Sequence, residues 1–123
     1  MKTKAIVIED DVTLAQVFCE ALNHAGYDPT IFNDGQDALE NLAQDTKPYL
    51  IVLDLHLPNV SGAEILRFIR SEDELKETKV IVASADGTLA TTPEIEQFAT
   101  FLLQKPVRFS QLQMLAKRLH PDR

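Results

Sequence analysis

The stretch PYLIVLD, residues 48–54, decides the fold class of this chain. Five apolar or aromatic residues, 49–53, follow one another without a polar interruption, and Asp54 ends the run. A strand of this composition has no face that suits water, so both of its faces must be covered. Parallel sheets with helices on both sides provide that cover. Residues 49–53 are therefore predicted to form a central strand of a parallel sheet.

Four further short apolar runs predict the other strands, and amphipathic stretches between them predict helices. The predicted strands cover residues 5–8, 27–32, 80–83 and 101–103. The predicted helices cover residues 12–25, 34–43, 63–69, 88–99 and 111–119. Pro29 places its strand at an edge of the sheet, and Pro93 weakens the helix that contains it. Strands that alternate with helices indicate an α/β fold.

The composition is that of one ordinary globular domain. The chain has 123 residues, of which 45% are hydrophobic and 25% are charged, a balance typical of folded proteins. The formal net charge of −7 argues against direct nucleic-acid binding, because an acidic surface repels phosphates. No apolar run reaches the roughly 18 residues that a membrane helix needs, so no membrane insertion is expected. The single cysteine, Cys19, fits a reducing compartment, and we expect a cytoplasmic protein.

Polar and charged residues stand directly after the predicted strands. Glu9 and Asp10 follow the first strand, Asp54 the third, Ser84 the fourth and Lys105 the fifth. The carboxyl ends of parallel strands meet at one edge of the sheet, where functional crevices lie. Neighbouring carboxylates repel one another unless a cation is present, and hard oxygen ligands suit Mg²⁺. We therefore expect a magnesium site at this edge of the sheet.

The same residues suit phosphoryl transfer. A lysine and a hydroxyl can neutralise and hydrogen-bond a phosphoryl group, and the carboxylate of Asp54 is the natural nucleophile. Each residue alone also has a structural explanation, because Asp11 can cap the first helix and the pair Lys105-Pro106 can form a turn. The joint position of these residues at four strand ends favours the functional interpretation.

Four motifs follow one another along the chain: IEDD at residues 8–11, LDLHLPNVSG at 53–62, ASA at 83–85 and KP at 105–106. Together they resemble the receiver domain of bacterial two-component response regulators, over nearly the whole chain. The resemblance implies a flavodoxin-like α/β domain with five parallel strands in the order 2-1-3-4-5 and five helices. It also implies one receiver domain over residues 1–123, with no output domain in this chain.

The resemblance assigns a role to each residue of the expected site. Asp54 is the expected phosphoacceptor and, together with Asp10, a direct ligand of Mg²⁺. The backbone carbonyl of His56 completes the metal site, and Glu9 acts on the metal through a water molecule. Lys105 pairs with an oxygen of the phosphoryl group.

A second group of residues is expected to control switching and the lifetime of the phosphate. Ser84 matches the switch hydroxyl of the family, whereas Leu102 stands where the family has an aromatic switch residue. We therefore expect the signal to be relayed differently near Leu102. His56 and Asp86 match positions that flank the path of the hydrolytic water, and the small Ala85 leaves room for the imidazole of a phosphate donor.

The implied partners are a sensor histidine kinase or a histidine phosphotransfer protein, and a downstream target that binds the fourth helix, fifth strand and fifth helix. The chain is expected to catalyse only its own phosphorylation and dephosphorylation. Two alternatives stay open: a Mg²⁺-dependent phosphatase of the haloacid-dehalogenase type, and a receiver-like module that binds partners without phosphorylation. The phosphatase family has a second Asp two residues after its nucleophile, where this chain has His56. Intact Asp54, Asp10 and Lys105 argue against the second alternative.

Overall fold

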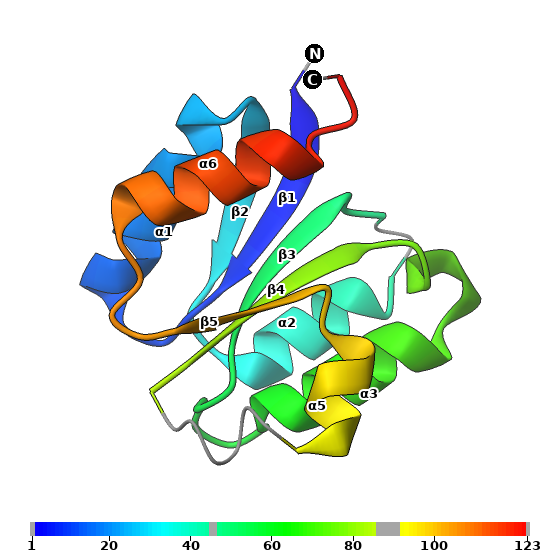
Figure 1. The fold of residues 1–123 in the computed structure, drawn as a ribbon. Helices are drawn as coiled ribbons and strands as arrows, with labels where there is room; N and C mark the ends of the chain where they lie inside the picture. Colours follow the sequence, from blue (N-terminus) through cyan, green and yellow to red (C-terminus); the bar gives the residue numbers. More distant parts are fainter. Residues whose placement is uncertain (1, 45–46, 86–91, 123) are drawn as a thin grey trace.

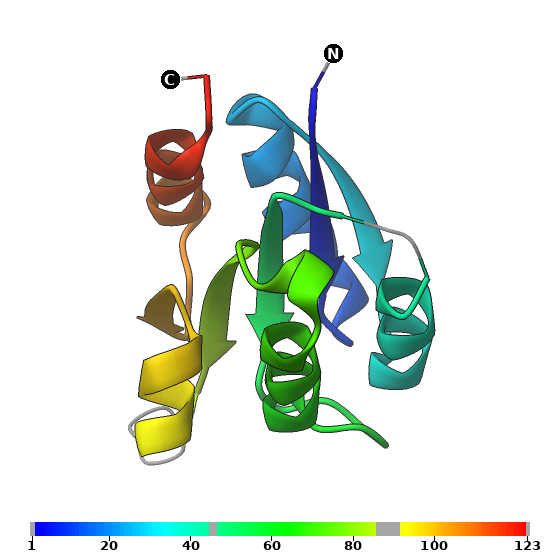
Figure 2. The same ribbon diagram turned by 90° about the vertical axis from the view of Figure 1, so that its right-hand side faces the viewer.

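The computed structural model of the chain describes residues 2–44, 47–85 and 92–122. Its centre is a five-stranded sheet in the order β2-β1-β3-β4-β5 (Figure 1). All neighbouring strands are parallel (Figure 2). The strands are β1 (Thr3–Ile8), β2 (Tyr27–Phe32), β3 (Leu50–Asp54), β4 (Lys79–Ser84) and β5 (Phe101–Gln104). The predicted strand order and the edge position of the strand that contains Pro29 are confirmed.

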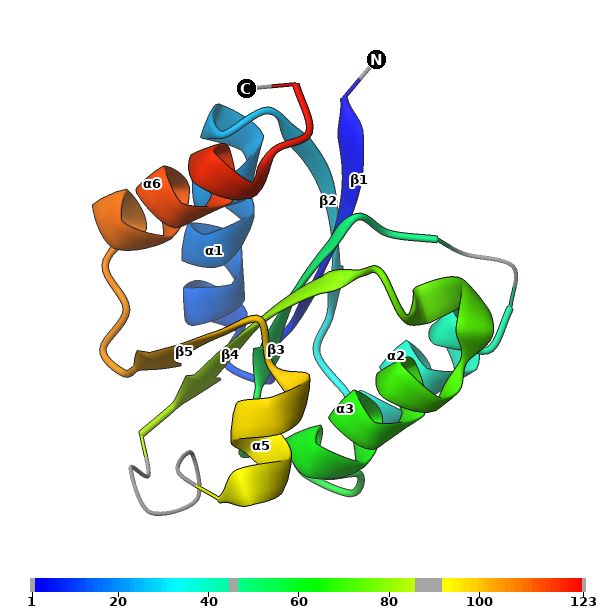
Figure 3. The same ribbon diagram turned by 45° about the vertical axis from the view of Figure 1, so that its right-hand side comes forward.

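Helices cover both faces of the sheet. The helices α1 and α6 pack on one face, and α2, α3 and α5 pack on the other (Figures 1 and 3). Their bounds are α1 (Val12–His24), α2 (Gly35–Leu42), α3 (Gly62–Ser71), α5 (Pro93–Phe98) and α6 (Phe109–Leu119), and a short 3-10 helix, η1 (Asp73–Leu75), follows α3. None of the helices in the described ranges is long and apolar enough to cross a membrane.

The central strand β3 is buried along its whole length. Leu50 and Val52 pack in the cluster under α1 and α6, whereas Ile51 and Leu53 pack in the cluster under α2 and α3. Successive side chains of a strand point to opposite faces of the sheet. When helices cover both faces, no side chain within the strand faces water, and apolar residues are favoured at successive positions. This two-sided burial is the physical reason for the uninterrupted apolar run in the sequence.

The helix predicted over residues 88–99 differs from the observed one. Among the described residues, α5 begins at Pro93 and ends at Phe98, and Thr92 has an extended backbone with ψ 145°. Proline is favourable at the first position of a helix, because a backbone N–H at that position would have no acceptor within the helix, so its absence costs nothing. The expectation that Pro93 weakens the helix is therefore wrong, since Pro93 begins it. Residues 88–91 lie outside the described ranges.

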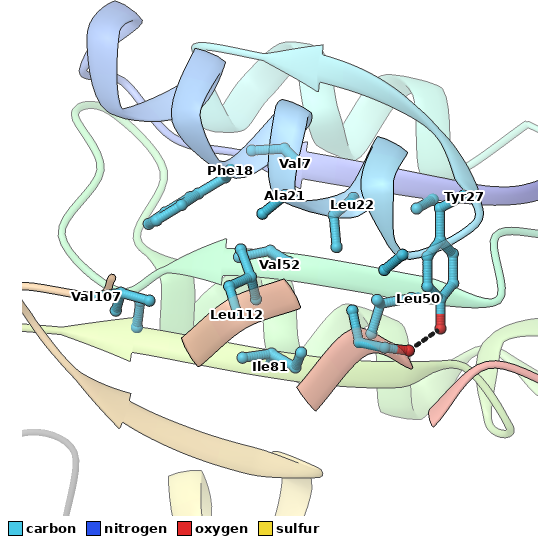
Figure 4. Close-up of a cluster of buried hydrophobic side chains, with 14 of the residues drawn as sticks. Val7, Phe18, Ala21, Leu22, Tyr27, Leu50, Val52, Ile81, Val107 and Leu112 are labelled. Carbon is cyan, nitrogen blue, oxygen red and sulfur yellow. Dashed lines mark hydrogen bonds between the residues drawn. The ribbon is translucent and has the colours of Figure 1, made fainter. Parts of the chain in front are cut away.

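A buried tyrosine ties β2 to the last helix. Tyr27 belongs to the cluster under α1 and α6, with Phe18 of α1 and Leu112 of α6 (Figure 4). Its hydroxyl donates a hydrogen bond of 2.8 Å to the backbone carbonyl of Ala116 in α6. Burial raises the pKa of Tyr27, so the hydroxyl keeps the proton that it donates.

The hydrogen bond from Tyr27 makes a measurable contribution to stability. We expect Tyr27→Phe to lower the free energy of unfolding by about 1 to 2 kcal/mol, because the variant leaves a buried carbonyl without its donor. Urea denaturation followed by circular dichroism measures the change. Tyr49→Phe is the matched control, since Tyr49 is only half-buried. Equal losses in the two variants would contradict this role of the Tyr27 hydroxyl.

Candidate functional site

Three carboxylates meet at the carboxyl edge of the sheet. β1 and β3 are neighbours, with Ile8 paired to Leu53, so Glu9 and Asp10 after β1 lie beside Asp54 at the end of β3. One carboxylate oxygen from each of the three residues lies within 4.8 Å of the others. Glu9 and Asp54 are buried, with 1% and 3% of their surface exposed, whereas Asp10 is exposed. The predicted convergence of these carboxylates is confirmed.

Lys105 joins the two buried carboxylates. Its Nζ lies 2.9 Å from Oε1 of Glu9 and 3.4 Å from Oδ1 of Asp54. The backbone N–H of Lys105 donates a hydrogen bond of 2.9 Å to the carbonyl of Ser84, which holds the backbone of Lys105 beside the end of β4. The peptide bond between Lys105 and Pro106 is cis. Buried charges are stable only when they are paired, so the ammonium group compensates the carboxylates of Glu9 and Asp54 together.

The shared site shifts the pKa values of Glu9 and Lys105. Burial raises the pKa of Glu9 from 4.5 to about 7; the hydrogen bond from Lys105 opposes this shift, and the negative charge of Asp54 adds to it. Burial acts to lower the pKa of Lys105, but its hydrogen bond and ion pair with Glu9, followed by its attraction to Asp54, outweigh burial and raise it. Lys105 therefore stays charged, and Glu9 takes up a proton close to neutral pH.

The backbone around Asp54 is held in place by two local contacts. The N–H of His56 donates to Oδ1 of Asp54 at 3.0 Å. The N–H of Gly62, the first residue of α3, donates to the carbonyl of Leu55 at 3.1 Å. A Cβ atom at Gly62 would lie 2.5 Å from the carbonyl oxygen of Asp54, so only glycine permits this approach. The start of α3 is thus pressed against the end of the strand that carries Asp54.

Ser84 and His56 come together although they are far apart in the sequence. Ser84 ends β4 and is 2% exposed. Its Oγ lies 3.4 Å from Nε2 of His56, an exposed side chain on the loop after β3. Ala85 follows as an exposed residue. The expected switch hydroxyl and one expected modulator are therefore direct neighbours, whereas Asp86 lies outside the described residues.

Leu102 lies on the edge strand β5 and is 37% exposed. It pairs with Val82 in the sheet, two residues before Gln104, which pairs with Ser84. Phe101 and Leu103 instead line a groove against α6, as expected from the alternation of side chains along a strand.

Asn33 was missed by the sequence analysis. Its Nδ2 donates to the backbone carbonyl of Glu9 at 2.9 Å, and the N–H of Glu9 donates to the carbonyl of Phe32 at 3.1 Å. The residue follows β2 directly. The strand-end rule that identified Glu9 and Asp54 would have found Asn33 as well, if it had been applied to the second strand.

Known proteins share sequence and fold with this chain. Residues 5–117 match the family described as the response regulator receiver domain. The polar-differentiation response regulator DivK of Brucella anthropi is 32% identical over 97 residues, which cover 79% of this chain and 78% of DivK. The DNA-binding response regulator MtrA of Mycobacterium tuberculosis is 27% identical over 112 residues, and these cover 91% of this chain but 48% of MtrA. The chain therefore spans about half the length of that relative.

A solved structure supports the fold. The chemotaxis response regulator CheY4 of Vibrio cholerae matches with a TM-score of 0.85, covering 98% of this chain and 100% of CheY4. The sequence identity is 24%, so this likeness establishes the fold alone.

The raised pKa of Glu9 predicts a pH-dependent stability. Between its unfolded value near 4.5 and its folded value of about 7, the folded chain binds a proton that the unfolded chain has lost. The contribution of Glu9 to stability is therefore present at low pH and is lost as the pH rises through this window. In the absence of divalent cations, we expect the free energy of unfolding to fall when the pH is raised from about 5 to about 8. The contribution of Glu9 to this fall is about 1 to 3 kcal/mol.

Urea denaturation at several pH values measures this slope. Glu9→Gln removes the titrating group and should flatten it, whereas Glu40→Gln, a change at an exposed residue of α2, should leave it unaltered. A wild-type slope retained in Glu9→Gln would show that another group is responsible.

Proposed function

The chain belongs to the receiver domain family of two-component response regulators, and on this premise we propose that Asp54 accepts a phosphoryl group from a histidine kinase or a phosphotransfer protein. The observation that carries the proposal is the position of Asp54 at the end of the fully buried β3, with the ammonium group of Lys105 3.4 Å away. A carboxylate held rigidly beside a positive charge is suited to attack phosphorus, because the charge of the incoming group is compensated.

The two oxygens of Asp54 have different environments. Oδ1 accepts the hydrogen bond from the N–H of His56 and lies beside Lys105, so we assign the attack on phosphorus to Oδ2. The new bond joins Oδ2 to phosphorus, and the bond from phosphorus to the donor nitrogen breaks. Lys105 shifts from Glu9 toward an oxygen of the phosphoryl group, and the hydroxyl of Ser84 donates a hydrogen bond to another of its oxygens.

The carboxylate cluster has the chemistry of a Mg²⁺ site. Receiver domains use Mg²⁺ at an acidic pocket, and the oxygens of Glu9, Asp10 and Asp54 within 4.8 Å of one another are the hard ligands that this ion prefers. We propose that Asp10, Asp54 and the backbone carbonyl of His56 hold the ion, with Glu9 acting through a water molecule. When bound, the ion supplies positive charge that offsets the repulsion between the carboxylates and the phosphoryl group.

We further propose that phosphorylation changes a surface formed by α5, β5 and α6, through which a downstream protein is bound. Three of the large apolar side chains that are exposed in the described residues belong to β5 or α6: Phe101, Leu102 and Met114. An exposed apolar group of this kind is typical of an interaction surface. The chain is a signalling domain, and we propose that its catalysis is limited to its own phosphorylation and dephosphorylation.

Several expectations from the sequence stay predictions. These are the single receiver domain over residues 1–123, the cytoplasmic location and the lack of direct nucleic-acid binding. The family match supports the receiver function and favours neither the haloacid-dehalogenase type of phosphatase nor a module that works without phosphorylation.

Phosphorylation of Asp54 is tested by the mass of the intact protein. After incubation with acetyl phosphate and Mg²⁺ we expect a gain of one phosphoryl group, which Asp54→Asn abolishes because the amide is a poor nucleophile. Asp28→Asn, at an exposed aspartate of β2, is the matched control and should label normally. Labelling of Asp54→Asn would refute the assignment, and release of many phosphates per chain would favour the phosphatase alternative.

His56 is expected to tune how long the phosphate lasts. Its imidazole lies beside the hydroxyl of Ser84, with Nε2 3.4 Å from Oγ. We expect His56→Ala to change the dephosphorylation rate, followed by mass spectrometry after removal of the donor, because the variant removes this neighbour of the site. A rate that His56→Ala leaves unchanged would exclude this role.

A further inference from the structure

Arg70, near the end of α3, binds the backbone of two other segments and the side chain of Thr100. Its Nε donates to the carbonyl of Phe98, the last residue of α5, at 2.8 Å. Its Nη1 donates to the carbonyl of Thr78 at 2.8 Å and to that of Lys76 at 3.1 Å. Its Nη2 lies 3.5 Å from Oγ1 of Thr100, which also accepts from the N–H of Val80. This half-buried guanidinium therefore holds the end of α5 against the starts of β4 and β5.

Arg67 lies one turn earlier on α3 and binds the other end of α5. Its Nε lies 2.9 Å from Oε1 of Glu94, in the first turn of α5. The two side chains are 53% and 43% exposed, so solvent weakens this ion pair. The helices α3 and α5 lie side by side (Figure 3). Two arginines at positions i and i+3 of α3 thus contact both ends of α5.

The two attachments differ in strength for physical reasons. The half-buried guanidinium of Arg70 makes several charge-assisted hydrogen bonds to backbone carbonyls. Salt screens these bonds little, and a change of the Arg70 rotamer would break all of them at once. The ion pair of Arg67 with Glu94 is a single exposed contact of the kind that contributes little. We call the Arg70 contacts to Phe98 and Thr78 the hinge, and the Arg67–Glu94 ion pair the latch.

α3 also connects this pair of attachments to the phosphorylation site. The start of α3 at Gly62 is pressed against the backbone of Asp54 and Leu55. A displacement of the loop after β3 is therefore transmitted to α3 as a whole, because a helix moves as a rigid element between packed neighbours.

We propose that α5 turns about the hinge when the latch opens, and that the latch stabilises the unphosphorylated arrangement of the surface formed by α5, β5 and α6. This inference rests on the proposed phosphorylation of Asp54 and concerns its regulation. It supplies a route from the site to α5 through α3, in a chain that has Leu102, rather than an aromatic residue, at the switch position of β5. A bistable contact of this kind is how small local shifts become movements of whole elements.

The latch is tested with beryllofluoride, a mimic of the phosphoryl group, titrated in the presence of Mg²⁺. Hydrogen exchange of residues 93–98 is the readout. Arg67→Ala and Glu94→Ala should each lower the beryllofluoride midpoint by a factor of about 2 to 5, the equilibrium equivalent of an exposed ion pair. The double variant should show no further change, because both substitutions remove the same contact. Glu96→Ala, at an exposed residue of the same helix, is the matched control.

The hinge is tested with Arg70→Lys, which keeps the charge but cannot reach both carbonyls at once. We expect faster exchange at residues 93–98 with and without beryllofluoride, and a smaller difference between the two states. If this variant does not fold, the cycle of Arg67 and Glu94 still decides the matter.

Two outcomes overturn the inference separately from the proposed function. In the first outcome, the wild type is labelled at Asp54, but Arg67→Ala and Glu94→Ala have the same beryllofluoride midpoint as Glu96→Ala. This result would overturn the latch and leave the proposed function intact. A raised midpoint in those variants would mean that the contact stabilises the active state, and would also overturn it. A wild type that neither labels nor responds to beryllofluoride would overturn the proposed function together with the inference that rests on it.

Discussion

The ammonium group of Lys105 between the carboxylates of Glu9 and Asp54 is the interaction on which the rest of the site depends. Two carboxylates that are almost fully removed from water cannot both be charged without a nearby cation. The three side chains come from the ends of β1, β3 and β5, so the contact exists only when the sheet has its full strand order. The same group that keeps the resting site stable is the one that a phosphoryl group would engage.

The site is also rigid where its chemistry needs rigidity. Asp54 ends a strand whose every residue is buried, and the close approach of Gly62 holds α3 against that strand. The two contacts between α3 and α5 are less uniform: the Arg70 contacts are half-buried, whereas the ion pair of Arg67 with Glu94, one turn closer to the start of α3, is exposed. This difference places the adjustable contact at the first turn of α5.

The sequence predicted local features well where one physical cause acted alone. The apolar run at residues 49–53 has two-sided burial as its only explanation, and the strand-end rule correctly grouped Glu9, Asp10 and Asp54. It was less reliable where two causes compete. The sequence predicts that Pro93 weakens the helix over residues 88–99, yet proline is also a good first residue of a helix, and its position relative to the helix start decides between the two effects.

By itself, the sequence determined the alternation of strands and helices, the residues at the strand ends and the family, because these depend on neighbouring residues and on ordered motifs. Only the tertiary structure decided which charges pair. Lys105 lies 96 residues from Glu9, and Arg70 lies 28 residues from Phe98, so no local pattern records these contacts. Each depends on the strand order, the packing of α3 on α5 and the length of one side chain, which together set distances that sequence spacing does not contain.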